Sequence, residues 1–170
     1  MAAPVIAYKF LDEGRVAPFT RYRWPEGEWV ETPAAVPCEA GIHACRVADL
    51  PFWLGRELWE VELDGDVIAF ERKVVAPRGR LTRRVEEWNR SLADEFAAAL
   101  LVHTRRRFGS VPVLSGFVGD IAQFRATNRV PLAGFAAARA AELAGGPRAY
   151  EEERLRQAHW LADRLALGEH

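Results

Sequence analysis

The chain has 170 residues, a net charge of −1 at pH 7, 49% hydrophobic residues and 28% charged residues. This balance is typical of a globular protein and excludes the low hydrophobicity and high net charge of disordered chains. Proteins that hold a phosphate backbone concentrate basic residues on one face, so the near-neutral charge disfavours nucleic acid as the main partner.

The length favours a single domain, residues 1–170, with a strand-rich half at 1–88 and a helical half at 89–170. The sequence has neither a visible secretion signal nor the run of about 18 apolar residues that a membrane span needs. Its two cysteines, Cys38 and Cys45, are typical of reduced thiols in a chain that needs no disulfide staple. We therefore expect a cytoplasmic protein that does not enter a membrane.

The first half of the chain carries the residue patterns of β-strands. In chain order we expect strands at Pro4–Phe10, Phe19–Trp24, Glu28–Glu31, Glu57–Leu63, Val67–Phe70, Lys73–Ala76 and Leu81–Trp88. The clearest is Glu57–Leu63, where Trp59, Val61 and Leu63 share one face and the Asp64-Gly65 pair that follows suits a hairpin turn. The connections are too short for crossover helices, which predicts a mixed or antiparallel sheet.

After Asn89 the apolar pattern changes to a helical period. The first helix is expected to begin with Ser91 as its N-cap and to close at Gly109. Three more are expected at Phe117–Thr127, from Pro131 to Gly145, and after Pro147. Strands followed by helices predict an α+β fold with three to four helices packed on one face of the sheet.

The densest group of reactive residue types lies between Cys38 and Cys45. A zinc site built on Cys38, His43 and Cys45 lacks a fourth ligand nearby, so no metal is expected. His43 and Cys45 point to the same side of an extended segment, but side chains ~6–7 Å apart are too distant for a direct hydrogen bond. The alternative interpretation is that Cys45 is a buried small hydrophobic residue and His43 a packed histidine.

Four segments together resemble an uncharacterised domain of actinobacterial and phage proteins. They are Tyr8-Lys9-Phe10, Gly41–Cys45, Glu57–Gly65 and Lys73–Ala76. That domain is identified by a G-F-H-A-C signature and a following V-E-L-x-G strand, and the resemblance covers about residues 5–88. Ile42 stands where the signature has Phe, and the family supplies no function.

A second resemblance concerns the order of the motifs. A strand bearing Tyr-Lys, a stretch leading into a short helix with Trp53, and then a strong strand are similar in order to the NAD-binding half of ADP-ribosyltransferases. The resemblance implies that Lys9 and His43 contact NAD. It assigns no residue to the catalytic glutamate of those enzymes.

The leading hypothesis is an intracellular ligand-binding or interaction domain without a cofactor, whose partner is a small molecule or another protein. Its shallow pocket is expected at Tyr8, Lys9, His43, Cys45 and Trp53. The alternative is a divergent NAD-consuming ADP-ribosyltransferase-like enzyme. A third hypothesis is weak, salt-sensitive nucleic-acid binding through the arginines 105–107 at the end of the first helix.

Overall fold

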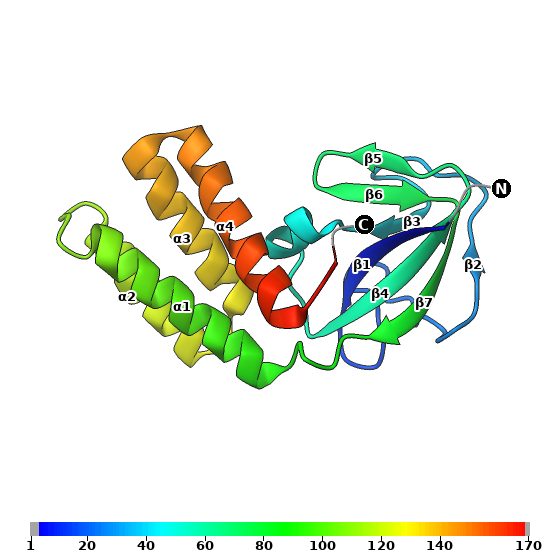
Figure 1. Ribbon diagram of the computed structural model, residues 1–170, viewed down its shortest axis with the longest axis horizontal. Helices are drawn as coiled ribbons and strands as arrows, with labels where there is room; N and C mark the ends of the chain where they lie inside the picture. Colours follow the sequence, from blue (N-terminus) through cyan, green and yellow to red (C-terminus); the bar gives the residue numbers. More distant parts are fainter. Residues whose placement is uncertain (1–3, 169–170) are drawn as a thin grey trace. The chain divides into compact units, whose positions relative to one another are not determined.

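The computed structural model describes residues 4–168, and Figure 1 shows their strands and helices. All named strands lie between Val5 and Arg84 and all α-helices between Arg90 and Leu165, which confirms the α+β prediction. The chain divides into two compact units, a sheet unit of residues 1–88 and 165–170 and a helical unit of residues 89–164. The single-domain expectation stays a prediction. Among residues 4–168, no helix is long and apolar enough to cross a membrane.

The strands form two antiparallel sheets, where the sequence predicted one. A four-stranded sheet has the order β1-β4-β7-β2, and a three-stranded sheet has the order β3-β6-β5. The strands are β1 (Val5–Leu11), β2 (Val30–Glu31), β3 (Ile42–Ala44), β4 (Glu57–Asp64), β5 (Ile68–Phe70), β6 (Lys73–Ala76) and β7 (Arg78–Arg84).

Strand β4 lies at the centre of the larger sheet, paired with β1 on one side and β7 on the other. Its predicted inward face is confirmed, because Trp59, Val61 and Leu63 are all buried in one hydrophobic cluster. Leu58, on the opposite face, is also fully buried. Strand β4 is therefore covered on both faces near its start, and it fixes the register of its neighbours.

Two of the predicted strands need correction. Residues 19–24 form no strand: Phe19 is 84% exposed, and the segment contributes only the single bridge between Val16 and Arg23. The strand predicted at Leu81–Trp88 begins earlier, at Arg78, and ends at Arg84. Pro77 alone separates β6 from β7. The short 3-10 helix η1 (Val47–Phe52) follows β3.

The two sheets are joined within the sheet unit by backbone and by close packing. Tyr8 and Cys45 exchange two backbone hydrogen bonds, of 2.7 and 2.8 Å, which connect β1 to the residue after β3. A Cβ atom at Gly79 would lie 2.7 Å from the Ile42 side chain. Glycine at position 79 thus allows β3 to approach β7 closely enough to share a core.

The helical unit contains α1 (Arg90–Phe108), α2 (Ser115–Ala126), α3 (Val130–Gly145) and α4 (Pro147–Leu165). The last residue of α4, Leu165, belongs to the sheet unit. Helices α1, α2 and α3 pack against one another, and small buried residues on α3 allow close contact. The predicted N-cap of α1 was wrong: the Asn89 side chain, rather than Ser91, accepts the first free backbone N–H groups. Ser91 is itself one of the donors.

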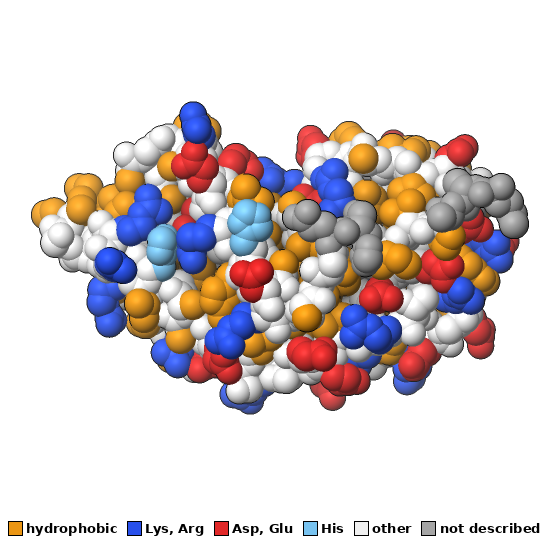
Figure 2. Space-filling model, viewed as in Figure 1, with side chains coloured by type: hydrophobic (Ala, Val, Ile, Leu, Met, Phe, Trp, Pro, Cys, Tyr) orange, Lys and Arg blue, Asp and Glu red, His pale blue; other side chains and the backbone are white. Residues whose placement is uncertain are grey.

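Acidic and basic side chains are interspersed on the surface of both units, on the face that Figure 2 shows. This mixture agrees with the net charge of −1. On strands β4 and β7 it arises from cross-strand ion pairs such as Glu62–Arg80 and Glu60–Arg83.

Candidate functional site

Tyr8 and Cys45, two of the five predicted site residues, lie in the interior of the sheet unit. Each is 3% exposed, and their backbones are the link between the two sheets. Burial raises the pKa of the Cys45 thiol to about 12, with a further increase from Asp49. Burial likewise raises the pKa of Tyr8. A protonated thiol without access to solvent is a poor nucleophile, so Cys45 packs as a small hydrophobic residue.

Lys9 turns its ammonium group towards the protein backbone. Its Nζ donates to the His43 carbonyl oxygen at 2.5 Å and lies 5.1 Å from the centre of the Trp24 ring. Burial lowers the pKa of Lys9 to about 8. The ammonium group therefore supports the short strand β3 and has a cation–π contact as its second partner.

Trp53 fixes the turn between β5 and β6. Its indole N–H donates to the Arg72 carbonyl oxygen at 2.7 Å. The Arg46 Nη2 donates to the neighbouring carbonyl oxygen of Glu71, and the Arg46 Nε donates to the Asp49 carboxylate at 2.5 Å. The two residues that flank η1, Arg46 and Trp53, thereby hold the turn that leads directly into Lys73.

His43 is the predicted site residue that lies at the edge of a polar cluster. Its Nδ1 lies 3.1 Å from the Gly41 carbonyl oxygen, and its Nε2 lies 3.3 Å from the backbone nitrogen of Cys38. Because a carbonyl can only accept and a backbone N–H can only donate, the ring is neutral with its proton on Nδ1. Burial lowers the pKa of His43, and the charge of Lys73 lowers it further.

Cys38 and Lys73 complete this group, which we call the thiol–amine cluster: Cys38, His43 and Lys73. The Lys73 Nζ donates to the Cys38 Sγ at 3.1 Å, and Cys38 is exposed to solvent. Within residues 4–168, Lys73 has no carboxylate within ion-pair distance. A half-buried lysine thus holds its ammonium group beside an exposed thiol, which places a cation next to a potential nucleophile.

The strand register explains why these three residues meet. His43 lies opposite Val75 across β3 and β6, and side chains two residues apart on a strand share a face, so Lys73 lies on the His43 side. Cys38 lies in a tight turn closed by two hydrogen bonds between Val36 and Ala40. Sequence reasoning singled out Cys38 and His43 but missed Lys73, which comes 35 residues after Cys38.

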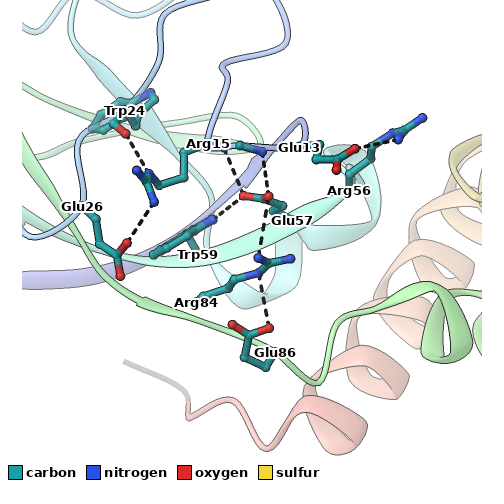
Figure 3. A network of polar contacts seen from close by, with 10 residues as sticks. Glu13, Arg15, Trp24, Glu26, Arg56, Glu57, Trp59, Arg84 and Glu86 are labelled. Carbon is teal, nitrogen blue, oxygen red and sulfur yellow. Dashed lines mark hydrogen bonds and ion pairs between the residues drawn. The ribbon is translucent and has the colours of Figure 1, made fainter.

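Glu57 is the most highly connected carboxylate of the sheet unit, and it organises the loop that carries Trp24 (Figure 3). It accepts from the backbone nitrogens of Gly14 and Arg15 and from the Trp59 indole, at 2.9, 3.2 and 3.0 Å. Arg15 in turn donates to the Trp24 carbonyl at 3.0 Å. Burial would raise the pKa of Glu57, but these hydrogen bonds lower it below the ordinary value.

The helical unit has its own buried polar cluster, centred on Glu153. The Glu153 side chain is 2% exposed and accepts two hydrogen bonds from Arg156 and one from Gln157. Gln157 also donates to the Gly134 carbonyl, which ties α4 to α3. His103 Nε2 lies 3.4 Å from Glu153 Oε2 and is buried without a hydrogen-bond partner. This cluster is enclosed and mainly structural.

Two shallow hollows lie on the helical unit. The larger, of about 510 Å³, is lined partly by Arg90, Asp94 and Arg125, and Arg125 bonds both carboxylate oxygens of Asp94 at 2.8 Å. The smaller, of about 350 Å³, lies where α3 meets α4. Within residues 4–168, no three His, Cys, Asp or Glu side chains form a group that could hold a metal ion.

No protein-family model matches the chain, and neither a curated protein nor a solved structure matches it. The resemblances to the G-F-H-A-C domain and to ADP-ribosyltransferases therefore stay predictions.

Proposed function

We propose that the sheet unit is a binding domain for a small organic anion, which it holds at the thiol–amine cluster. The observation that carries this proposal is the Lys73 ammonium group, whose hydrogen-bond acceptor is an exposed thiol and which has no carboxylate partner within residues 4–168. A cation without a counter-charge attracts an anionic group.

Electrostatics and shape support an anion that also carries an apolar part. Burial lowers the pKa of His43, and the charges of Lys73 and Lys9 lower it further, so two cations act on the ring. Phe70 is 37% exposed, and the centre of its ring lies 5.8 Å from the Lys73 Nζ. The ring offers an apolar surface beside the cation, as small-molecule sites commonly do.

The test compares two carboxylates that differ only in their apolar part. Benzoate and acetate are titrated into the full-length protein, and the amide resonances of Cys38 and His43 are followed by NMR. We expect saturable shifts with a dissociation constant on the order of millimolar for benzoate, and weaker binding of acetate. Equal shifts with chloride at the same ionic strength would show screening rather than binding.

The control variants separate charge from side-chain shape. Lys73→Met should abolish the benzoate-dependent shifts, whereas Lys73→Arg should keep them because the positive charge remains. Arg83→Met removes a partly exposed basic residue that pairs with Glu60 on the other sheet, and it should leave binding unchanged. Unchanged binding in Lys73→Met would contradict the proposal.

The alternative of a NAD-consuming enzyme depends on the orientation of Lys9 rather than on Lys73. It requires the Lys9 side chain to face the cofactor, but the Lys9 ammonium donates to the His43 carbonyl and contacts Trp24. Calorimetric titration with NAD tests this alternative, and heat that saturates and is lost in Lys9→Met would favour it over the organic-anion proposal.

The proposed location is the cytoplasm. Cys38 and Cys45 are both free thiols, which agrees with a reducing compartment. The measurement is cell fractionation, in which the protein should appear in the cytoplasmic fraction.

A further inference from the structure

We propose that Cys38 and Lys73 form a reversible covalent cross-link, a sulfenamide, after a hydroperoxide oxidises the Cys38 thiol. The inference goes beyond the organic-anion site and does not depend on it, because the cross-link forms without any ligand. Its basis is the distance of 3.1 Å between the Lys73 Nζ and the Cys38 Sγ.

The Cys38 side is held by its turn. Val36 accepts hydrogen bonds from Glu39 and Ala40, and the Cys38 backbone N–H faces the His43 ring nitrogen at 3.3 Å. Cys38 has a φ of 69°, a left-handed conformation that a non-glycine residue adopts only where its surroundings impose it. The thiol is therefore presented to solvent from a fixed backbone.

The Lys73 side is held by strand β6 and by the turn before it. Lys73 pairs with Phe70 in the β5–β6 ladder, and Trp53 bonds the carbonyl of the preceding residue, Arg72. Two groups that both lie on fixed backbone react as if at high local concentration. This placement favours the reaction of the Lys73 amine with an oxidised Cys38 sulfur.

The first step oxidises sulfur and reduces the peroxide. The Cys38 thiol gives up its proton to solvent, and its sulfur attacks one oxygen of the hydroperoxide. A sulfur–oxygen bond forms, the oxygen–oxygen bond breaks, and the departing oxygen takes up a proton to leave as water or an alcohol. The product is a sulfenic acid at Cys38.

The second step joins the two side chains without a further oxidant. Lys73 loses its ammonium proton to solvent, and the neutral amine attacks the Cys38 sulfur. A sulfur–nitrogen bond forms, the sulfur–oxygen bond breaks, and hydroxide leaves with the second proton from nitrogen as water. Sulfenic acids condense with nitrogen in this way. An external thiol reverses the link: it attacks the Cys38 sulfur and releases the amine, and a second thiol then reduces the resulting mixed disulfide to the free Cys38 thiol.

Cys45 does not compete as the resolving group. Its thiol is 3% exposed, and burial raises the pKa of that thiol to about 12, so it supplies neither thiolate nor access. A nearby amine rather than a second thiol is thus the available nucleophile.

The experiment treats the full-length protein with a small excess of hydrogen peroxide and measures its intact mass. We expect a loss of two hydrogens, a peptide that links residues 38 and 73, and no tryptic cleavage after Lys73. Dithiothreitol should restore the original mass. Cys45→Ala should give the same linked peptide, which excludes a disulfide as the source of the mass change.

Lys73→Arg provides the matched control, because it keeps the positive charge but lacks the amine. It should stop at the sulfenic acid, which dimedone traps. Circular dichroism verifies that each variant is folded. Equal dimedone trapping at Cys38 in the wild type and in Lys73→Arg, with no linked peptide, would overturn the inference and leave the anion site untouched. A native Cys38 that resists peroxide would overturn it as well.

Discussion

Replacing Glu57 by glutamine should destabilise the sheet unit by about 2 kcal/mol. The Glu57 side chain is 6% exposed, and its two oxygens together accept three hydrogen bonds, from Gly14, Arg15 and Trp59. Glutamine keeps one acceptor oxygen and turns an NH₂ group towards at least one of these donors. Each hydrogen bond to a charged group contributes roughly 1.5–3 kcal/mol, so losing one and leaving its donor unpaired gives the stated size.

Urea unfolding followed by tryptophan fluorescence measures this loss selectively. Five of the six tryptophans lie in the sheet unit, so the signal reports mainly on that unit. Glu13→Gln is the matched control: it removes the same charge from the same network, but Glu13 is 85% exposed and pairs with Arg56 at 3.5 Å (Figure 3). An exposed pair contributes about 0–1 kcal/mol. Equal unfolding midpoints for the two variants would refute the structural role of Glu57.

The pH dependence of the same variant provides a second test. The pKa of Glu57 is lowered from its ordinary value of 4.5, so the folded state holds the carboxylate in its charged form. Its contribution to stability is present above pH 4.5 and is lost as the pH falls through the lower pKa of the folded state. Glu57→Gln should therefore lose less stability on acidification than the wild type, whereas Glu13→Gln should follow the wild type.

Three further predictions follow from the same structure. Gly41→Ala should cost about 2 kcal/mol more than Gly27→Ala: both glycines have positive φ, but only at Gly41 would the new Cβ lie 2.7 Å from Val75. Equal urea midpoints would contradict this. Iodoacetamide at mildly alkaline pH should label one cysteine of the native protein, and Cys45, with a pKa of about 12, only after unfolding. Burial lowers the pKa of His103 below its ordinary value of 6.5, so the folded state favours the neutral ring and the free energy of unfolding decreases as the pH falls below 6.5. His103→Gln should make the melting temperature, measured by circular dichroism, depend less on pH in this range.

The sequence predicted the elements whose residue pattern determines their structure. Strand β4 alternates regularly and is buried where expected, and the four helices begin within a few residues of their predicted starts. The segment 19–24 was wrongly predicted to be a strand because it is rich in aromatic residues. Its loop is instead fixed by contacts from elsewhere: Glu57 holds Gly14 and Arg15, and Arg15 holds Trp24. Such long-range bonds leave no local periodicity.

The candidate site was only partly predictable for the same reason. The spacing between Cys38 and His43 placed both in one segment, and the structure confirms that they are neighbours, with the Cys38 N–H bonded to the imidazole. The approach of Lys73 depends on β3 pairing with β6, which a single sequence does not reveal. From the sequence alone, Cys45 is as plausible a reactive thiol as Cys38, and only the burial of Cys45 in the structure distinguishes the two.

The roles of Lys9 and Lys73 differ because strands β3 and β6 are held in place by different numbers of other contacts. Strand β3 has three residues, so its ladder supplies few hydrogen bonds, and the buried Lys9 ammonium adds one to the His43 carbonyl from the neighbouring sheet. That bond uses the Lys9 charge to stabilise the fold. Lys73 lies on β6 at the start of a ladder already held by Trp53, so its ammonium group is not needed for that purpose. The lysine that the fold does not use for its own stability is the one that faces the exposed thiol, and it is there that binding and chemistry should be sought.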